Sequence, residues 1–185
     1  DELLRETPIL LQILNFGVSG ETSRQGLERF PDQVQDKSPN VLTVQFGLND
    51  CNCWISDRGL PRVSELAFHA NLIEIIDRAR KSGVDHIILS NNHPTLRFKP
   101  MISGEPFDKA NARYNKIISQ VAEETKVTFC DINAAFADMN ERQLSEMLLP
   151  YPDQLHLSEM GNKVYFDTIW PHIENAVGLY LDQLR

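Results

Sequence analysis

The chain has 185 residues, of which 42% are hydrophobic and 24% charged, and its formal net charge is −8. This length and composition are those of an ordinary globular protein with one buried core. The negative charge, with no run of Lys or Arg, argues against a nucleic-acid-binding surface. No apolar run approaches the ~20 residues that a membrane-spanning helix needs. We therefore expect a single domain over residues 1–185, with no nucleic-acid partner and no membrane span.

The first third of the chain alternates apolar runs with small-residue turns. Residues 2–6 resemble the end of an amphipathic helix, and the apolar run 9–14 has the length of a buried strand. A small-residue turn follows and leads into a helical stretch that ends near residue 35. The next apolar run, 40–46, predicts a second strand that ends at Gly47-Leu48-Asn49-Asp50. The long loop after it, to residue 61, is of the kind often used for binding.

The rest of the chain continues the alternation of strands and helices. Ser64 is a suitable cap for a helix that ends at Gly83. The remaining elements that we expect, in chain order, are a strand at 86–90, a helix at 107–124, a strand at 127–132, short helices to 148 and a last helix at 159–184.

This order predicts an α/β protein. Strands that are apolar throughout and separated by helices form parallel sheets with both faces covered. Ligands bind such sheets outside the carboxyl ends of the strands. Because the polar clusters follow strands or lie in the last loop, we expect them to meet at one edge.

The most informative cluster is Asp153-Gln154-Leu155-His156, in the loop before the last helix. A carboxylate three residues before a histidine can hold one imidazole nitrogen and leave the other free to accept a proton from a hydroxyl nucleophile. The alternative is an Asp that caps the last helix beside an unrelated His. The spacing alone does not decide between these interpretations.

Two further stretches carry residues that could act together with this cluster. They are residues 15–22 (Asn-Phe-Gly-Val-Ser-Gly-Glu-Thr) and Gly47-Leu48-Asn49-Asp50. With Asp153 and His156 they resemble, in order and spacing, the SGNH (GDSL-type) esterase and lipase family. Gly20 precedes Asn49 by 29 residues (49 − 20). The resemblance covers essentially the whole chain. It implies a flavodoxin-like three-layer α/β/α fold and hydrolysis of small or acyl esters by Ser-His-Asp chemistry, with no metal and no cofactor.

The resemblance also implies roles for single residues. Gly20, through its backbone N–H, and Asn49, through its side-chain amide, would form the oxyanion hole, and both groups suit that task physically. The alternative for each is a turn residue. His156 would act as general base and then general acid, and Asp153 would orient it. We expect Asp50 to support its loop.

Other residues near the expected edge are weaker candidates. His93 ends a strand there, so we consider it a substrate-pocket residue, whereas His69, His86 and His172 lie within helices or at a strand start. Trp54, in the long loop 51–62, is a second possible substrate-pocket residue. Together with Arg58 and Arg62 of the same loop, it is also a candidate for a lid or for binding an acidic substrate.

The nucleophile of the family is missing from the chain. No Gly-Asp-Ser occurs in the 185 residues, and Gly-x-Ser-x-Gly is also absent. Ser19 is a minor candidate beside Gly20. We therefore expect a domain that lacks its first strand and is N-terminally incomplete. Either the natural protein has residues before Asp1, or the chain is a truncated form. A truncated form would expose a strand edge and could dimerise or swap an element.

The cysteines and the absence of other motifs narrow the possible functions of the chain. Cys51, Cys53 and Cys130 form no CxxC pair, and no HxxxH occurs, so we expect free thiols in a reducing compartment, the cytoplasm, and no zinc site. A nucleotide binder is disfavoured because neither GxGxxG nor GxxxxGK[ST] is present. Two functions remain: a serine ester hydrolase acting on a small-molecule ester, and a catalytically inactive binding or assembly module with the same fold.

Overall fold

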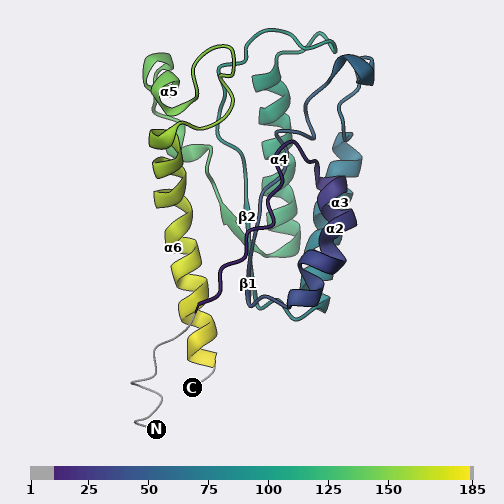
Figure 1. Cartoon of the computed structure of the whole chain (residues 1–185), viewed down its shortest axis with the longest axis vertical. Helices are drawn as coiled ribbons and strands as arrows, with labels where there is room; N and C mark the ends of the chain where they lie inside the picture. Colours follow the sequence, from purple (N-terminus) through teal and green to yellow (C-terminus); the bar gives the residue numbers. More distant parts are fainter. Residues whose placement is uncertain (1–10, 184–185) are drawn as a thin grey trace.

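The computed structural model describes residues 11–183, which form a three-stranded parallel sheet with helices packed against it (Figure 1). The strands are β1 (Val41–Val44), β2 (His86–Ser90) and β3 (Thr128–Cys130), and their order in the sheet is β1-β2-β3. Both neighbouring pairs are parallel. Strand order and chain order therefore agree, and the carboxyl ends of all three strands lie at one edge.

The helices match the predicted pattern closely. They are α2 (Ser23–Gln33), α3 (Glu65–Lys81), α4 (Phe107–Thr125), α5 (Glu141–Met147) and α6 (Glu159–Gln183), with short 3-10 turns η1 (Gln35–Lys37), η2 (Ile55–Asp57) and η3 (Ala134–Phe136). Ser64 caps α3 as expected, because its side chain accepts a hydrogen bond from the amide of Ala67 at 3.4 Å.

Two hydrophobic cores cover the two faces of the sheet. Ile87 and Leu89 of β2 pack into the core that α3 and α4 line, whereas Ile88 between them packs into the core lined by α5 and α6. This alternation follows from the period of two along a strand. Figure 1 shows α6 on one side of the sheet and α3 and α4 on the other. The predicted three-layer α/β/α arrangement is confirmed.

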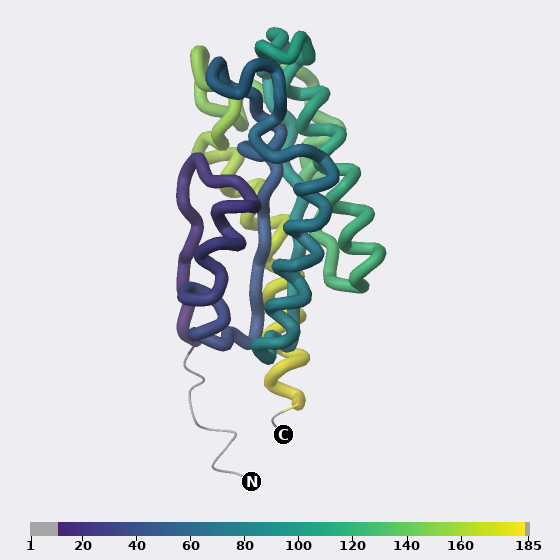
Figure 2. Tube along the Cα trace, turned by 90° about the vertical axis from the view of Figure 1, so that its right-hand side faces the viewer, coloured from purple at the N-terminus to yellow at the C-terminus, as the bar shows by residue number. Residues whose placement is uncertain are grey.

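We expected a strand at residues 9–14, and this prediction is wrong for residues 11–14. Residues 9 and 10, and the helix that we expected at residues 2–6, lie outside the described residues. Residues 11–14 pair with no strand and are exposed, with Ile13 at 86%. Figure 2 shows this segment running along the β1 side of the molecule. An apolar run becomes a strand only when a neighbouring edge supplies backbone partners. Within the described residues β1 makes no pair on that side.

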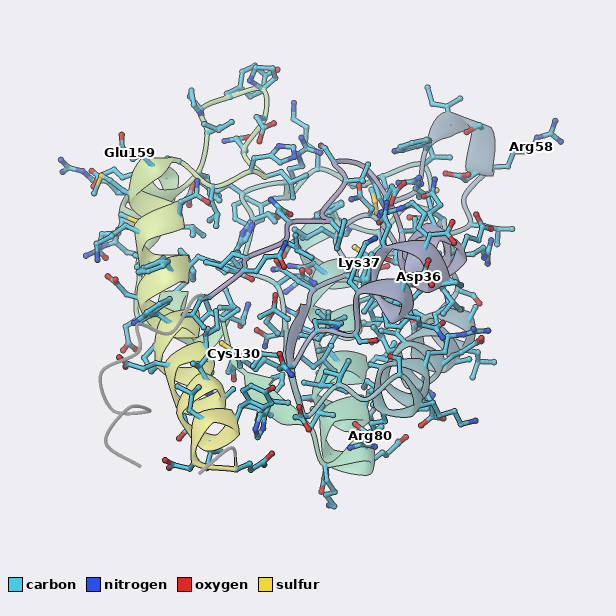
Figure 3. All side chains as sticks on the ribbon, turned by 60° about the horizontal axis from the view of Figure 1, so that its bottom comes forward. Asp36, Lys37, Arg58, Arg80, Cys130 and Glu159 are labelled. Carbon is cyan, nitrogen blue, oxygen red and sulfur yellow. The ribbon has the colours of Figure 1, made fainter. Side chains whose placement is uncertain are left out.

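The three cysteines are free, as expected, and all three are buried. Cys130 lies at the end of β3 beneath α6, and Figure 3 places it inside the body of the molecule. Burial raises the pKa of Cys51 and of Cys130, whose value reaches about 11. These thiols are therefore poor nucleophiles at neutral pH.

Candidate active site

The loop before α6 holds Asp153 and His156 in direct contact. The Nδ1 atom of His156 lies 2.8 Å from Oδ2 of Asp153. Because a carboxylate only accepts hydrogen bonds, Nδ1 is the donor, and in the neutral imidazole the lone pair is then on Nε2. The His156 side chain is 61% exposed. The pair has the arrangement of a base and its orienter.

The second oxygen of Asp153 fixes the turn itself. Oδ1 accepts the backbone amides of Leu155 at 2.9 Å and of His156 at 2.7 Å. Partial burial of the carboxyl disfavours its charge, but these amides and the imidazole outweigh that effect and lower the pKa of Asp153 to about 2. Asp153 is therefore an anion across the whole neutral range, which is the state that stabilises a protonated imidazole.

The alternative interpretation, that Asp153 caps the last helix, is wrong. Helix α6 begins at Glu159, and its first turn is capped by Ser158, whose hydroxyl accepts the amide of Gly161 at 3.2 Å. The loop is further held by backbone bonds between Leu149 and His156, at 2.7 Å, and between Gln154 and Leu149, at 3.1 Å. Asp153 thus serves the His156 turn and not the helix.

Gly20 lies in the turn that precedes α2. Its φ of +80° is in the left-handed region that glycine adopts without strain. The carbonyl of Gly20 accepts a hydrogen bond from Nη1 of Arg62 at 2.8 Å, while the described structure shows no partner for its amide. The Gly20 amide, which belongs to the preceding peptide, is therefore free to donate to an oxyanion.

Asn49 lies in the tight turn directly after β1. The turn needs Gly47, because its φ is +126° and a Cβ there would meet Nδ2 of Asn92 at 2.5 Å. The same Nδ2 donates to the carbonyl of Phe46 at 3.0 Å and so holds the turn against the end of β2. Within residues 11–183 the Asn49 side chain has no hydrogen-bond partner, so its amide is available to a ligand.

Asp50 connects the two candidate oxyanion loops. Its Oδ1 accepts the backbone amide of Ser23 at 2.9 Å and the Ser23 hydroxyl at 2.5 Å, and Oδ2 accepts the amide of Gly47 at 3.1 Å. The residue is fully buried. Burial raises the pKa of Asp50, and the bonds from Ser23 and Gly47 offset part of that rise. Asp50 therefore joins the start of α2 to the Asn49 turn, the supporting role expected from the sequence.

His93 follows β2 at the same edge but is almost entirely buried. Its Nδ1 donates to the carbonyl of Pro94 at 2.9 Å, and its ring packs against Phe136 with centroids 6.1 Å apart. Burial lowers the pKa of His93, and the nearby His156 lowers it further. The structure thus brings the two imidazoles within electrostatic reach, with His93 neutral beneath the surface.

The long loop 51–62 reaches the site through one arginine. The Arg62 guanidinium stacks on the Trp54 ring, 3.9 Å from its centroid, and also donates to the Gly20 carbonyl. Arg58 is at the tip of the loop and points away from the body of the molecule (Figure 3). Of the three residues that we grouped, Arg62 therefore contacts both Trp54 and Gly20, whereas Arg58 lies away from them.

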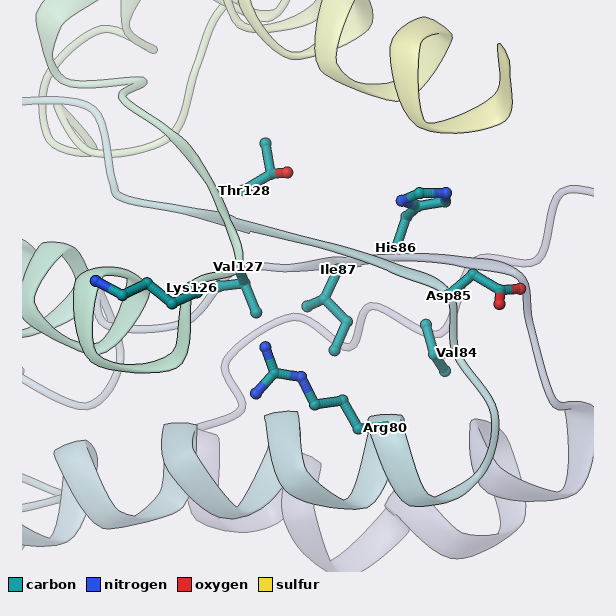
Figure 4. Close-up of a pocket in the computed structure, with 8 residues that line it drawn as sticks. All are labelled: Arg80, Val84, Asp85, His86, Ile87, Lys126, Val127 and Thr128. Carbon is teal, nitrogen blue, oxygen red and sulfur yellow. The ribbon is translucent and has the colours of Figure 1, made fainter. Parts of the chain in front are cut away.

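One cavity in the structure lies far from this edge. A space of about 130 Å³ is lined by Arg80, His86, Lys126 and neighbouring residues (Figure 4). His86 is the first residue of β2 and Lys126 lies just before β3, so the cavity is at the amino ends of these strands. Parallel sheets bind their ligands at the other edge.

Sequence reasoning missed Arg97, which lies in the motif-free loop between β2 and α4. Its Nε donates to the carbonyl of Asp153 at 2.6 Å. No sequence signal could have found this contact, because 56 residues separate the two partners.

In the part of the chain that the structure describes, no three His, Cys, Asp or Glu side chains gather as metal ligands, and no helix could cross a membrane. Nor does any described hydroxyl bond to Nε2 of His156.

Solved structures share this fold. A GDSL-like lipase from Bacteroides thetaiotaomicron superimposes with a TM-score of 0.70 at 22% sequence identity, over 86% of this chain and 74% of that one. The likeness shows that this chain shares the α/β/α fold of that structure.

The sequence profile of the GDSL-like lipase/acylhydrolase family matches residues 1–164, and the chain belongs to this family. Its relatives include the uncharacterised lipoprotein YqeF of Bacillus subtilis, 29% identical over 86% of this chain and 72% of that protein. An acetylxylan esterase of Geobacillus stearothermophilus is 24% identical, over 83% of this chain and 68% of that protein. An isoamyl acetate-hydrolysing esterase of Saccharomyces cerevisiae is 25% identical, over 96% of this chain and 75% of that protein.

Proposed function

We propose that the protein hydrolyses carboxylic esters with His156 as general base and Asp153 as its orienter. The single observation that carries this proposal is the 2.8 Å bond between Nδ1 of His156 and the Asp153 carboxylate. It leaves an exposed Nε2 lone pair at the edge of the sheet where the Gly20 and Asn49 loops lie. Base, orienter and two candidate oxyanion donors together make up the protein side of acyl transfer apart from its nucleophile.

The steps follow from these positions. Nε2 of His156 removes the proton of a serine hydroxyl as its oxygen attacks the ester carbonyl, and the ionised Asp153 stabilises the imidazolium. The carbonyl oxygen becomes an anion, to which the Gly20 N–H and the Asn49 amide donate. His156 then protonates the leaving alcohol. Water, activated by the same imidazole, hydrolyses the acyl-enzyme.

The nucleophile is proposed to come from outside these 185 residues. Support comes from the absence of Gly-Asp-Ser in the sequence and of a described hydroxyl at His156 Nε2. Two of the relatives are named for acetate esters, so we extend the proposal to short acyl groups. A cytoplasmic location remains a prediction from the free cysteines, and one relative is named a lipoprotein.

The decisive variant is His156→Ala in the natural gene product, assayed with 4-nitrophenyl acetate. We expect kcat/KM to fall by about four orders of magnitude or more. His172→Ala is the matched control, because that histidine lies on α6 and forms no bond in the described structure. Retained turnover in His156→Ala would exclude the proposed base.

The second candidate is an inactive module that binds an ester without cleaving it. The unpartnered Nε2 of His156 favours it for the 185-residue chain by itself. The two functions differ in their reaction with a fluorophosphonate, which labels only an activated nucleophile. Labelling of the natural gene product would exclude the inactive module.

A further inference from the structure

Arg97 reaches the Asp153 loop from a different part of the fold. It lies between β2 and α4, and its Nε donates to the backbone carbonyl of Asp153 at 2.6 Å. Its Nη2 lies 4.0 Å from Oδ2 of Asp153, the oxygen that holds His156. One guanidinium therefore touches both the backbone and the carboxylate of the orienting residue.

The surroundings of Arg97 hold it in this place. The amide of the preceding residue, Leu96, donates to the carbonyl of Gln154 at 3.1 Å, so two consecutive residues bond to two consecutive carbonyls of the 153–154 turn. The guanidinium also lies 5.9 Å from the ring centroid of Phe107, in the first turn of α4. The side chain is only 33% exposed. This geometry is a built contact between the β2–α4 loop and the last loop.

We propose that Arg97 is a positioning residue that sets the orientation of Asp153, and through it that of His156. The inference rests on the proposed ester hydrolysis. A charge-assisted bond to a carbonyl fixes the peptide plane from which the carboxylate projects. The imidazole follows, because both Asp153 oxygens bond to His156.

The test compares Arg97→Gln and Arg97→Lys in the natural gene product, with Arg142→Gln as a matched control on the 88% exposed Arg142. In Arg97→Gln we expect kcat to fall about 10–100-fold, the effect of a displaced catalytic group, with KM changed less than about twofold. Arg97→Lys keeps the charge but not the planar guanidinium, so its kcat should be intermediate.

Wild-type kcat in Arg97→Gln would overturn the inference. So would a fall in kcat that only matches a fall in the fraction of folded protein, which a merely structural role predicts. If Arg97→Gln does not fold, Arg97→Lys decides: we expect a lower kcat with KM changed less than about twofold, and a wild-type kcat would overturn the inference. His156→Ala is measured in parallel. Activity retained there refutes the proposed function, whereas its loss beside a wild-type Arg97→Gln refutes only the role of Arg97.

Discussion

At the scale of single residues, the site depends on carboxylates with different tasks. Asp153 serves one short turn and the imidazole beside it, and the motif spacing predicted that contact. Asp50 accepts a hydrogen bond from Ser23, which lies 27 residues away, and another from the amide of Gly47. Gly47 has a φ of +126° and, beside Asn92, no space for a Cβ. Local pairs can be predicted from spacing. The long-range partners could not, because the chain order does not encode which loop reaches a buried carboxylate.

Removing the Asp50 carboxylate should destabilise the protein strongly. In Asp50→Ala the buried amides of Ser23 and Gly47 lose their acceptor, and each orphaned donor costs about 1–3 kcal/mol. We expect the free energy of unfolding to fall by about 2–5 kcal/mol in urea titrations at pH 7. Asp36→Ala, at an exposed position, is the control and should change it by less than about 0.5 kcal/mol. Equal effects would show that the Asp50 bonds do not form.

The ionisation of Asp153 predicts a pH-dependent contribution to stability. Its pKa is lowered from 3.8 to about 2, so the folded state favours the anion. The stabilisation is complete above the unfolded value and is lost as the pH falls from about 4 towards 2. Asp153→Asn should therefore lower the urea midpoint relative to wild type at pH 6, and this difference should shrink at pH 3. A difference that grows on acidification would contradict the assignment.

At the scale of elements, the hydrophobic pattern predicted each helix between residues 23 and 183 and the three strands that pair. Each of these runs meets a surface that can bury it: α3 carries Phe68, Leu72 and Ile76 into the core that α4 completes. The run 9–14 is also apolar, yet its described residues 11–14 form no strand. Composition gives the tendency to form a strand, but only a neighbouring edge gives the hydrogen bonds.

The core assignment of α3 can be tested on one helix. Leu72 is 1% exposed and Leu66 is 87% exposed. Leu72→Ala should cost about 2–5 kcal/mol of unfolding free energy, through lost burial and the cavity left behind. Leu66→Ala should change it by less than about 0.5 kcal/mol. Urea denaturation of the two variants side by side measures the contrast, and similar losses would mean that α3 presents another face to the sheet.

At the scale of the whole molecule, β1 has a single neighbour within the described residues, and the apolar segment 11–14 lies exposed on its side. The amides of residues 11–16 donate to no backbone carbonyl in the described structure, whereas β2 is paired on both sides. Hydrogen–deuterium exchange on the 185-residue chain should therefore be fast for residues 11–16 and slow for β2. Protection of 11–16 that appears only at high protein concentration would instead reveal a second copy pairing at this edge, the dimer considered from the sequence.

The most direct test of the proposed ester hydrolysis is fluorophosphonate labelling of the natural gene product, followed by peptide mapping of the modified residue. We expect the label on a serine outside these 185 residues, and we expect His156→Ala to prevent labelling. Labelling of Ser19, or of any other residue printed here, would contradict the proposed origin of the nucleophile. Absence of labelling in the wild-type protein, or labelling that persists in His156→Ala, would contradict the Asp153–His156 site itself.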